Sequence, residues 1–467
     1  MAARAPSDGD DRDAPLAERF APLMARVAQC ARPGETSAGW FAGERSDFVR
    51  FNRGRVRQAG SVERHTLDLR LMRADRQAHE SIVLVGRLDT DAARVDAAFA
   101  RLRDTIAHAE PDPYLSFDDT GGASRSVRAA GAPNPDEIAD TVCVAADDSD
   151  LVGFWSAGPI ARGFASSRGH SHWHESGRWS FDWSIHVPAA GRAAGGFPGE
   201  GGRALKATLT GESWSAPALS AAIARSVRDA AVLARPARRL EPGHYRAWLA
   251  PRALADLVGM LGWGGFSERA HRSGQSPLAR LRAGESAFDA RVQFAERLGD
   301  AGVPLFQADG FARPPELALV RDGRHAGSLV SPRSAREFGV AANGAADAEA
   351  PEALAMAPGG LDETRALAEL GEGVAVSNLW YLNFSDRRAC RVTGLTRFAT
   401  MWVEGGEAVA PVEVMRFDDS LDRLLGSELV ELGDVAHRIP DTDTYDARAL
   451  GSTCVPGALV GALAFTL

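Results

Sequence analysis

The sequence predicts an α+β protein of two lobes, each a mostly antiparallel β-sheet with flanking helices. Three observations predict this class. The chain has 467 residues, 45% of them hydrophobic and 25% charged, which is enough to bury two cores. Runs in which apolar and polar residues alternate, such as residues 66–71, are typical of antiparallel strands with one wet face. Other runs, such as residues 91–109, place apolar residues at helical spacing.

The first part of the chain combines a helix with a strand meander. Residues 1–15 are polar and acidic, lack the apolar core of a signal peptide, and are predicted to be a disordered leader. Leu16 to Val27 form a helical stripe that Pro33 and Gly34 end. The period then changes to two, which predicts strands at residues 48–51, 56–58, 66–71 and 81–85.

The middle of the chain contains the predicted boundary between the lobes. Residues 110–140 are interpreted as a connector, residues 143–155 as one or two strands and residues 188–204 as a loop. A Pro-bearing stretch at residues 235–243 separates an N-terminal lobe, 16–235, from a β-rich C-terminal lobe, 236–467. Pro251 is expected to open a helix, and short β-like runs follow from about residue 300.

Composition excludes several classes of protein. The net charge of −9 does not indicate the basic surface that a nucleic-acid-binding protein needs. No apolar run reaches the roughly 18–20 residues that span a bilayer, so no membrane partner is expected. The four cysteines (Cys30, Cys143, Cys390 and Cys454) are far apart without a CxxC pair, which favours a reducing compartment. A cytoplasmic location is expected.

Four segments, in order, resemble the TldD/PmbA family of metallopeptidase-related proteins. They are SDFVRFNRGRVRQ at 46–58, GPIARGFASS at 158–167 with WHE at 173–175, FQADGF at 306–311, and NLWYLNF at 378–384 continuing through RVTGLTRF at 391–398. The resemblance covers residues 40 to 425. It implies a cytoplasmic, two-lobed protein that works in a dimer on unfolded or small modified peptides.

In that family the zinc-bearing subunit carries a helical HExxxH motif and a cysteine later in the chain. Catalytic zinc takes three protein ligands and a water, whose pKa it lowers to about 7. Histidines about one helical turn apart share a helix face, and the glutamate serves as general base. Here the matching helix, residues 252–264, contains no histidine, and its only carboxylate is Asp256. Cys454 lies near the C-terminus without imidazole partners and is interpreted as a packed residue.

This resemblance places the chain closer to the TldE/PmbA-like branch, which lacks the HExxxH motif. No zinc or other cofactor is expected in this chain. Zinc is expected in a partner subunit. The partner would be a zinc-bearing TldD-like subunit in a heterodimer, or a second copy in a homodimer.

A histidine-rich run, His170-x-His172-x-His174-Glu175, allows three interpretations. In an extended strand the three imidazoles share a face, about 7 Å apart. They would then hold a metal, contact a peptide, or belong to the structure alone. The peptide-binding candidates are Arg162, His172, Trp173, His174, Glu175, Asn378, Tyr381, Arg391 and Arg397.

Three functions follow. The first is a non-zinc-binding subunit that shapes the peptide channel of a zinc-bearing partner, with peptides bound by strand addition. The second is a stand-alone metal-dependent peptidase whose site has moved to His170, His172, His174 and Glu175. The third is a peptide-binding scaffold. No GxSxG elbow, phosphate loop or dinucleotide fingerprint is present.

Overall fold

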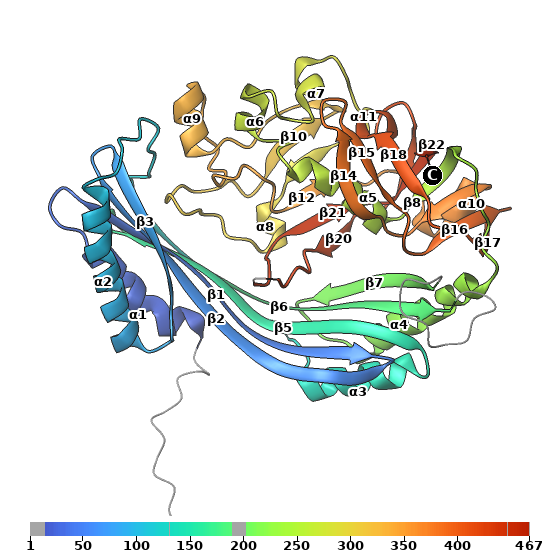
Figure 1. Ribbon diagram of the computed structural model, residues 1–467, viewed down its shortest axis with the longest axis horizontal. Coiled ribbons are helices and arrows are strands. Elements are labelled where there is room, and N and C mark those ends of the chain that lie inside the picture. Colours follow the sequence, from blue (N-terminus) through green and yellow to red (C-terminus); the bar gives the residue numbers. More distant parts are fainter. Residues whose placement is uncertain (1–14, 130, 189–201, 446, 467) are drawn as a thin grey trace, which may run out of the picture.

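A computed structural model describes residues 15–129, 131–188, 202–445 and 447–466. The predicted leader therefore lies, except for Pro15, outside the described residues, as does most of the predicted loop at 188–204. The predicted α+β class in two lobes is confirmed. A long curved sheet forms a cradle, and a β-rich lobe sits in its concave side (Figure 1).

The cradle is a seven-stranded sheet of order β3-β2-β1-β5-β6-β4, with β7 pairing the rest of β6. Its pairs are antiparallel except that β4 runs parallel to β6. The strands are β1 (Thr36–Asn52), β2 (Arg55–Arg73), β3 (Arg76–Val83), β4 (Gly122–Arg128), β5 (Asp150–Ser166), β6 (His170–Val187) and β7 (Arg203–Gly211).

Helices cover the convex side of the cradle (Figure 1). One end carries α1 (Leu16–Gln29) and α2 (Leu88–Ile106), and the other carries α3 (Pro135–Ala146) and α4 (Ala216–Ala230). The interpretation of 143–155 as strand was thus partly wrong, because Cys143 lies in α3. Alternate side chains of each strand point to the convex side and pack against these helices. In β1, for example, Phe41 packs under α1, and its even-numbered neighbours face the concave side.

His65 lies in the core beneath α1, 3% exposed, with its ring centroid 4.5 Å from that of Phe20. Burial lowers the pKa of His65 from 6.5 to about 4, although the nearby Glu63 opposes the shift. Between these values the unfolded chain binds a proton that the folded chain does not. Stability is therefore full above pH 6.5 and falls as the pH drops towards 4.

We expect His65 to contribute up to about 3 kcal/mol to this acid destabilisation. Urea unfolding from pH 7 to pH 4 will show a smaller loss of stability in His65→Phe than in the unaltered protein. The exposed His108 offers a control, because His108→Gln should leave the slope unchanged. Equal slopes in His65→Phe and the unaltered protein would contradict the prediction.

The C-terminal lobe divides its strands between two sheets. The smaller has the order β11-β10-β9-β12-β21-β20, and the larger has the order β14-β15-β18-β22-β8-β13-β16-β17, with β19 pairing β22. The smaller contains β9 (Phe294–Glu296), β10 (Leu317–Arg321), β11 (Arg324–His325), β12 (Leu354–Met356), β20 (His437–Pro440) and β21 (Ser452–Val455). The larger contains β8 (Gly243–Leu249), β13 (Gly373–Val376), β14 (Trp380–Asp386), β15 (Arg391–Leu395), β16 (Thr400–Glu404), β17 (Glu407–Pro411), β18 (Arg416–Ser420), β19 (Leu429–Leu432) and β22 (Ala458–Phe465).

Helix α5 (Pro251–Gly259) lies within the C-terminal lobe, where it packs against β8, β14, β20 and β21 (Figure 1). As predicted, Pro251 opens the helix, where its missing N–H has no helical acceptor to lose. The helix continues into the 3-10 turn η3 (Met260–Gly262). The remaining helical turns are η2 (Ala231–Ala234), α6 (Glu268–Arg272), α7 (Ala279–Ala283), α8 (Leu298–Ala301), α9 (Pro332–Phe338), η4 (Glu363–Arg365), α10 (Ala366–Leu370) and α11 (Leu421–Leu424).

The loop between β20 and β21 joins the lobes. Arg448 in this loop is 7% exposed and reaches the concave side of the cradle. Its guanidinium donates to the Ser46 hydroxyl at 2.8 Å, the Gly158 carbonyl at 2.7 Å and the Arg178 carbonyl at 3.2 Å. It also pairs with Glu44 at 3.5 Å. A single side chain thus ties the C-terminal lobe to three strands of the cradle.

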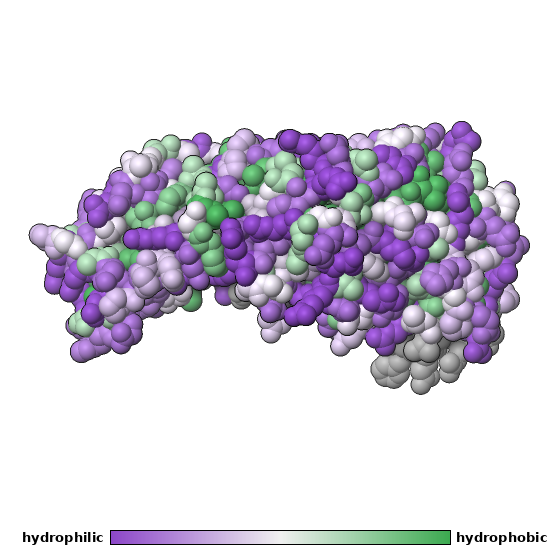
Figure 2. Space-filling view, turned by 90° about the horizontal axis from the view of Figure 1, so that it is seen from above, coloured by the Kyte–Doolittle hydropathy of each residue, from purple (hydrophilic) through white to green (hydrophobic). Residues whose placement is uncertain are grey.

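The face in Figure 2 is largely hydrophilic, with apolar side chains in scattered small groups. In the part of the chain that the structure describes, no helix has the length and apolar character to cross a membrane.

Candidate functional site

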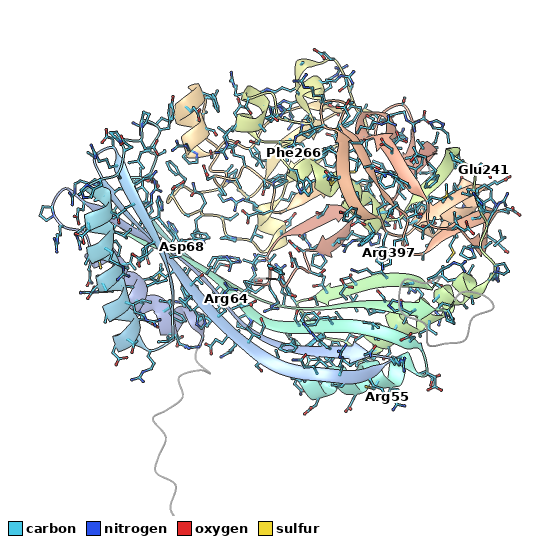
Figure 3. The ribbon with its side chains drawn as sticks, viewed as in Figure 1. Arg55, Arg64, Asp68, Glu241, Phe266 and Arg397 are labelled. Atoms are coloured by element: carbon cyan, nitrogen blue, oxygen red, sulfur yellow. The ribbon has the colours of Figure 1, made fainter. Side chains whose placement is uncertain are left out.

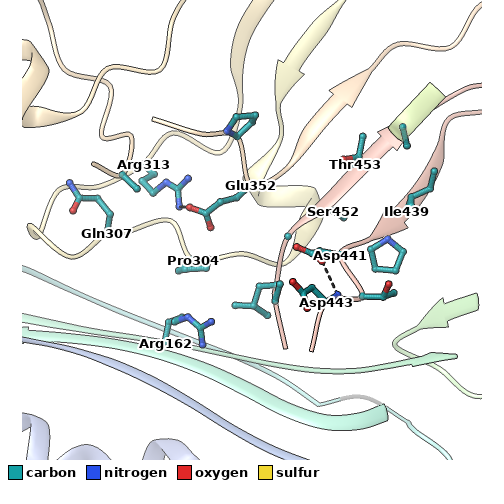
Figure 4. A pocket seen from close by; sticks show the side chains of 18 of the residues that line it. Arg162, Pro304, Gln307, Arg313, Glu352, Ile439, Asp441, Asp443, Ser452 and Thr453 are labelled. Atoms are coloured by element: carbon teal, nitrogen blue, oxygen red, sulfur yellow. Dashed lines mark hydrogen bonds and ion pairs between the residues drawn. The ribbon is translucent and has the colours of Figure 1, made fainter. Parts of the chain in front are cut away.

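A cavity of about 990 Å³ lies between the cradle and the C-terminal lobe (Figure 4). Four groups of residues line it, and one of them is a wall of loop residues, Pro304, residues 306–308, Arg313, Ala346, Pro351 and Glu352. The concave face of the cradle contributes Arg162 and Asp182, helix α5 contributes Arg252 and Asp256, and the β20–β21 loop and adjoining strands contribute residues 439–443 and 449–453. The cavity is large enough to hold several residues of an extended peptide. We call it the interlobe cleft.

Helix α5 presents an ion pair to the interlobe cleft. Arg252 and Asp256 are four residues apart, so they share one helix face, and Arg252 Nε donates to Asp256 Oδ1 at 3.0 Å. Asp256 Oδ2 accepts from the Leu379 backbone N–H at 3.0 Å. Burial raises the pKa of Asp256, while Arg252 and the Leu379 amide oppose that shift. Both carboxylate oxygens are therefore engaged within the protein.

This face does not fit a catalytic zinc. An arginine stays protonated and offers no lone pair to a metal, and the one carboxylate of the face is already bound to Arg252 and Leu379. His271 lies beyond η3 in α6, where its ring contacts His325 at 5.3 Å between centroids, outside the cleft lining. Over the described ranges, no group of three or more His, Cys, Asp or Glu residues is placed to hold a metal ion.

Cys454 lies in β21 but is not among the residues that line the interlobe cleft. Its neighbours Ser452 and Thr453 line the cleft, whereas Cys454 borders a separate small cavity with Arg297 and Arg438. The cysteine and the cleft-facing side of α5 thus do not form one site.

The histidine-rich run forms the start of β6, as an extended strand requires. His170, His172 and His174 lie on the concave face, and each imidazole has its own partner. His170 Nδ1 lies 2.7 Å from Ser166 Oγ, His172 Nδ1 lies 2.9 Å from Ser124 Oγ, and His174 Nε2 donates to the Gly302 carbonyl at 2.8 Å. His174 therefore helps to hold the C-terminal lobe against the cradle.

Trp173 and Glu175 point to the opposite face of β6. Glu175 Oε2 accepts from Trp173 Nε1 and from the Ala17 backbone N–H of α1, each at 3.2 Å, and both side chains are buried beneath that helix. The structure thus separates Glu175 from the three histidines of the proposed relocated metal site. It also separates Trp173 and Glu175 from the interlobe cleft.

The remaining candidates lie in or beside β14 and β15, the first two strands of the larger C-terminal sheet. Asn378 is buried before β14, and Tyr381 in β14 is 78% exposed with a left-handed φ of 57°. Arg391 pairs with Asp418. Arg397 stacks over Trp380 at 4.4 Å and lies on the side of the lobe that faces the cradle (Figure 3). None of these four lines the interlobe cleft.

Of the nine candidates, Arg162 alone lines the cleft, and His172 lies beside it, stacked on the cleft residue Phe306 at 5.1 Å. Sequence reasoning missed the pair formed by Arg252 and Asp256, although their i, i+4 spacing is a signal for an ion pair on a helix. It also missed the β20–β21 loop, whose contacts with the cradle are long-range in sequence.

This chain is a two-lobed α+β protein in which a β-rich lobe sits in a cradle. Solved structures of other proteins have a similar fold. TldE from Thermococcus kodakarensis matches with a TM-score of 0.77 at 13% identity, covering 96% of this chain and 100% of that one. Candidate modulators of DNA gyrase from Thermotoga maritima and Bacteroides thetaiotaomicron each match with a TM-score of 0.73 at 15% identity. Each comparison covers 96% of this chain, and 100% and 98% of the other chain respectively. These likenesses establish the fold.

The family assignment comes from the C-terminal lobe. Residues 242–466 match the model of the PmbA/TldA metallopeptidase C-terminal domain. The chain belongs to the TldD/PmbA family. No curated protein sequence matches it.

Proposed function

We propose that this chain is the non-zinc-binding subunit of a TldD/PmbA-type metallopeptidase complex. It would pair in the cytoplasm with a zinc-bearing TldD-like subunit and shape the channel through which unfolded or small modified peptides reach that subunit. The observation that carries the proposal is the cleft-facing side of α5. It presents Arg252 and Asp256 where a zinc-bearing relative needs imidazoles and a general base.

The interlobe cleft supports peptide handling by this chain. Strand β7 contributes Lys206 to the lining, and within the described residues its pairing is with β6 alone. Its outer edge therefore offers backbone N–H and C=O groups beside the cleft. An extended peptide that adds to such an edge gains main-chain hydrogen bonds without a requirement for sequence. That mode suits a protein that receives unfolded chains.

Co-purification with a sibling provides the test. We expect the chain alone to bind much less than one zinc per chain and to leave an unstructured test peptide uncut. Co-expression with an HExxxH-containing sibling should yield a stable complex with about one zinc per pair and chelator-sensitive cleavage. Metal analysis of each separated subunit should place the zinc in the sibling.

Two results would contradict the proposal. One zinc per chain with chelator-sensitive cleavage by the chain alone would make it a peptidase in its own right. Failure to bind any HExxxH-containing sibling, with peptide binding retained, would favour the scaffold function or a homodimer.

A further inference from the structure

We propose that Arg162 is the receptor for a peptide carboxylate in the interlobe cleft. This inference rests on the proposed function, because it names the chemical group that the peptide presents there. Arg162 lies in the middle of β5, paired across the strands with His174 of β6 and Ala42 of β1. Its side chain rises from the cradle towards the wall that contains Arg313 and Glu352 (Figure 4).

The other three cations of the cleft lining are each paired with a carboxylate. Lys206 lies 3.3 Å from Asp182, Arg252 lies 3.0 Å from Asp256, and Arg313 lies 2.8 Å from Glu352. Arg162 differs. In the described part of the chain no carboxylate lies within 4.0 Å of it, and its hydrogen bond goes to the carbonyl of its own neighbour, Ala161, at 2.9 Å.

The two acids that act on Arg162 from a distance, Glu352 and Glu44, already have other partners. Glu352 pairs with Arg313, and Glu44 accepts from the Arg448 backbone N–H at 3.0 Å. The Arg162 charge is thus left without a close counter-ion, in a place where burial lowers its pKa. A half-buried cation is stabilised most by an anion with which it can form hydrogen bonds.

The guanidinium has the geometry for a carboxylate. It carries five N–H donors in a planar fork, of which Ala161 takes one. The rest match the two oxygens of a carboxylate, which arginine binds through two parallel hydrogen bonds. In a peptide this group is either the C-terminal carboxylate or the side chain of an aspartate or glutamate.

Three unlabelled, N-terminally acetylated peptides of Ala, Ser, Gly and Thr test this assignment by isothermal titration calorimetry on the full chain. One ends in a free carboxylate, one is C-terminally amidated and neutral, and one is amidated with a central glutamate. We expect at least one carboxylate peptide to bind tenfold or more tightly than the neutral peptide. The peptide that gains affinity identifies the source of the carboxylate. This comparison uses the unaltered protein, so it does not depend on how any variant folds.

Variants then locate the receptor. Arg162→Gln should abolish the preference for carboxylate, and Arg162→Lys should retain part of it, because lysine keeps the charge but loses the fork. Arg57→Gln is the matched control, since Arg57 is exposed on β2 away from the cleft lining, and it should keep the full preference. Arg162→Met should melt at the same temperature as the unaltered protein or higher, because it removes an unpaired half-buried charge.

The outcomes separate this inference from the proposed function. Equal binding of all three peptides, or a preference that survives in Arg162→Gln, would overturn the role of Arg162 and leave peptide handling intact. Absence of binding to every peptide, by the chain alone and with its sibling, would overturn both.

Discussion

Replacing Arg448 with methionine is expected to lower the free energy of unfolding by about 3–5 kcal/mol, the range for breaking a buried ion pair. The guanidinium loses its contacts with Ser46, Gly158 and Arg178, and Glu44, which is 6% exposed, keeps a charge without a cation. Burial lowers the pKa of Arg448 to about 10, so the side chain remains charged at neutral pH. Urea titration followed by tryptophan fluorescence measures the loss.

A double-mutant cycle with Glu44→Gln isolates the ion pair. Because Arg448→Met harms the protein partly by leaving Glu44 unpaired, the double variant should be more stable than the sum of the single losses predicts, by about 0.5–3 kcal/mol. A loss below about 1 kcal/mol for Arg448→Met, on the scale of an exposed pair, would show that this residue does not hold the lobes together.

Replacing Gly158 with alanine is expected to cost more than about 3 kcal/mol, which combines an unfavourable backbone conformation with a steric clash. Gly158 lies in β5 where the pairing with β1 is interrupted, at φ +128°. A β-carbon built there would lie 2.1 Å from the Arg45 carbonyl oxygen, a backbone atom that cannot move without shifting β1. The Gly158 carbonyl is also an acceptor for Arg448.

Gly169→Ala is the matched control, because Gly169 also has a positive φ, +89°, but a β-carbon there meets nothing within 4 Å. It should cost only the conformational part, about 1–2 kcal/mol. Comparison of the two by thermal and urea unfolding separates strain from clash. If the two substitutions cost the same, the close approach of β1 and β5 at Gly158 contributes nothing.

The sequence predicted the class of fold but shortened its strands. Residues 48–51 and 66–71 were predicted as separate short strands, whereas β1 and β2 run for 17 and 19 residues. Glycines and charged residues interrupt the alternation within them, and no local pattern then favours a strand. Pairing with neighbours extends these strands, because β1 bonds to β2 on one side and to β5 on the other. The length of these strands thus depends on tertiary contacts, which a local sequence pattern does not show.

A local signal was available for one missed helix. Residues 110–140 were interpreted as a connector, yet α3 begins at Pro135 within them. Asn134 and Glu137 form a capping box in which the Asn134 side chain accepts from the Glu137 N–H at 2.9 Å. The spacing of these two residues, with proline at the first helical position, is a start signal that a sequence can show.

The candidate site was less accessible to prediction. The absence of histidine in α5 could be established from sequence, because a zinc motif is local to one helix. The residues that line the cleft could not be identified from the sequence, because they come from both lobes. Asp182 and Asp441, for example, lie on the same cavity although 259 residues separate them in the printed sequence. Strand alternation alone would have separated His174 from Glu175, since adjacent residues of a strand face opposite ways.

The β20–β21 loop has a consequence for the order in which the protein is made. Strands β1, β5 and β6 of the cradle are complete by residue 187. Arg448, which lies 404 residues after its partner Glu44, is synthesised much later. Strand β8, which opens the C-terminal lobe, likewise pairs with β22. Domains generally fold from the N-terminus during synthesis, so the concave face lacks its contacts with Arg448 until the β20–β21 loop has been made. A nascent chain that ends before this loop thus lacks one side of the cleft lining.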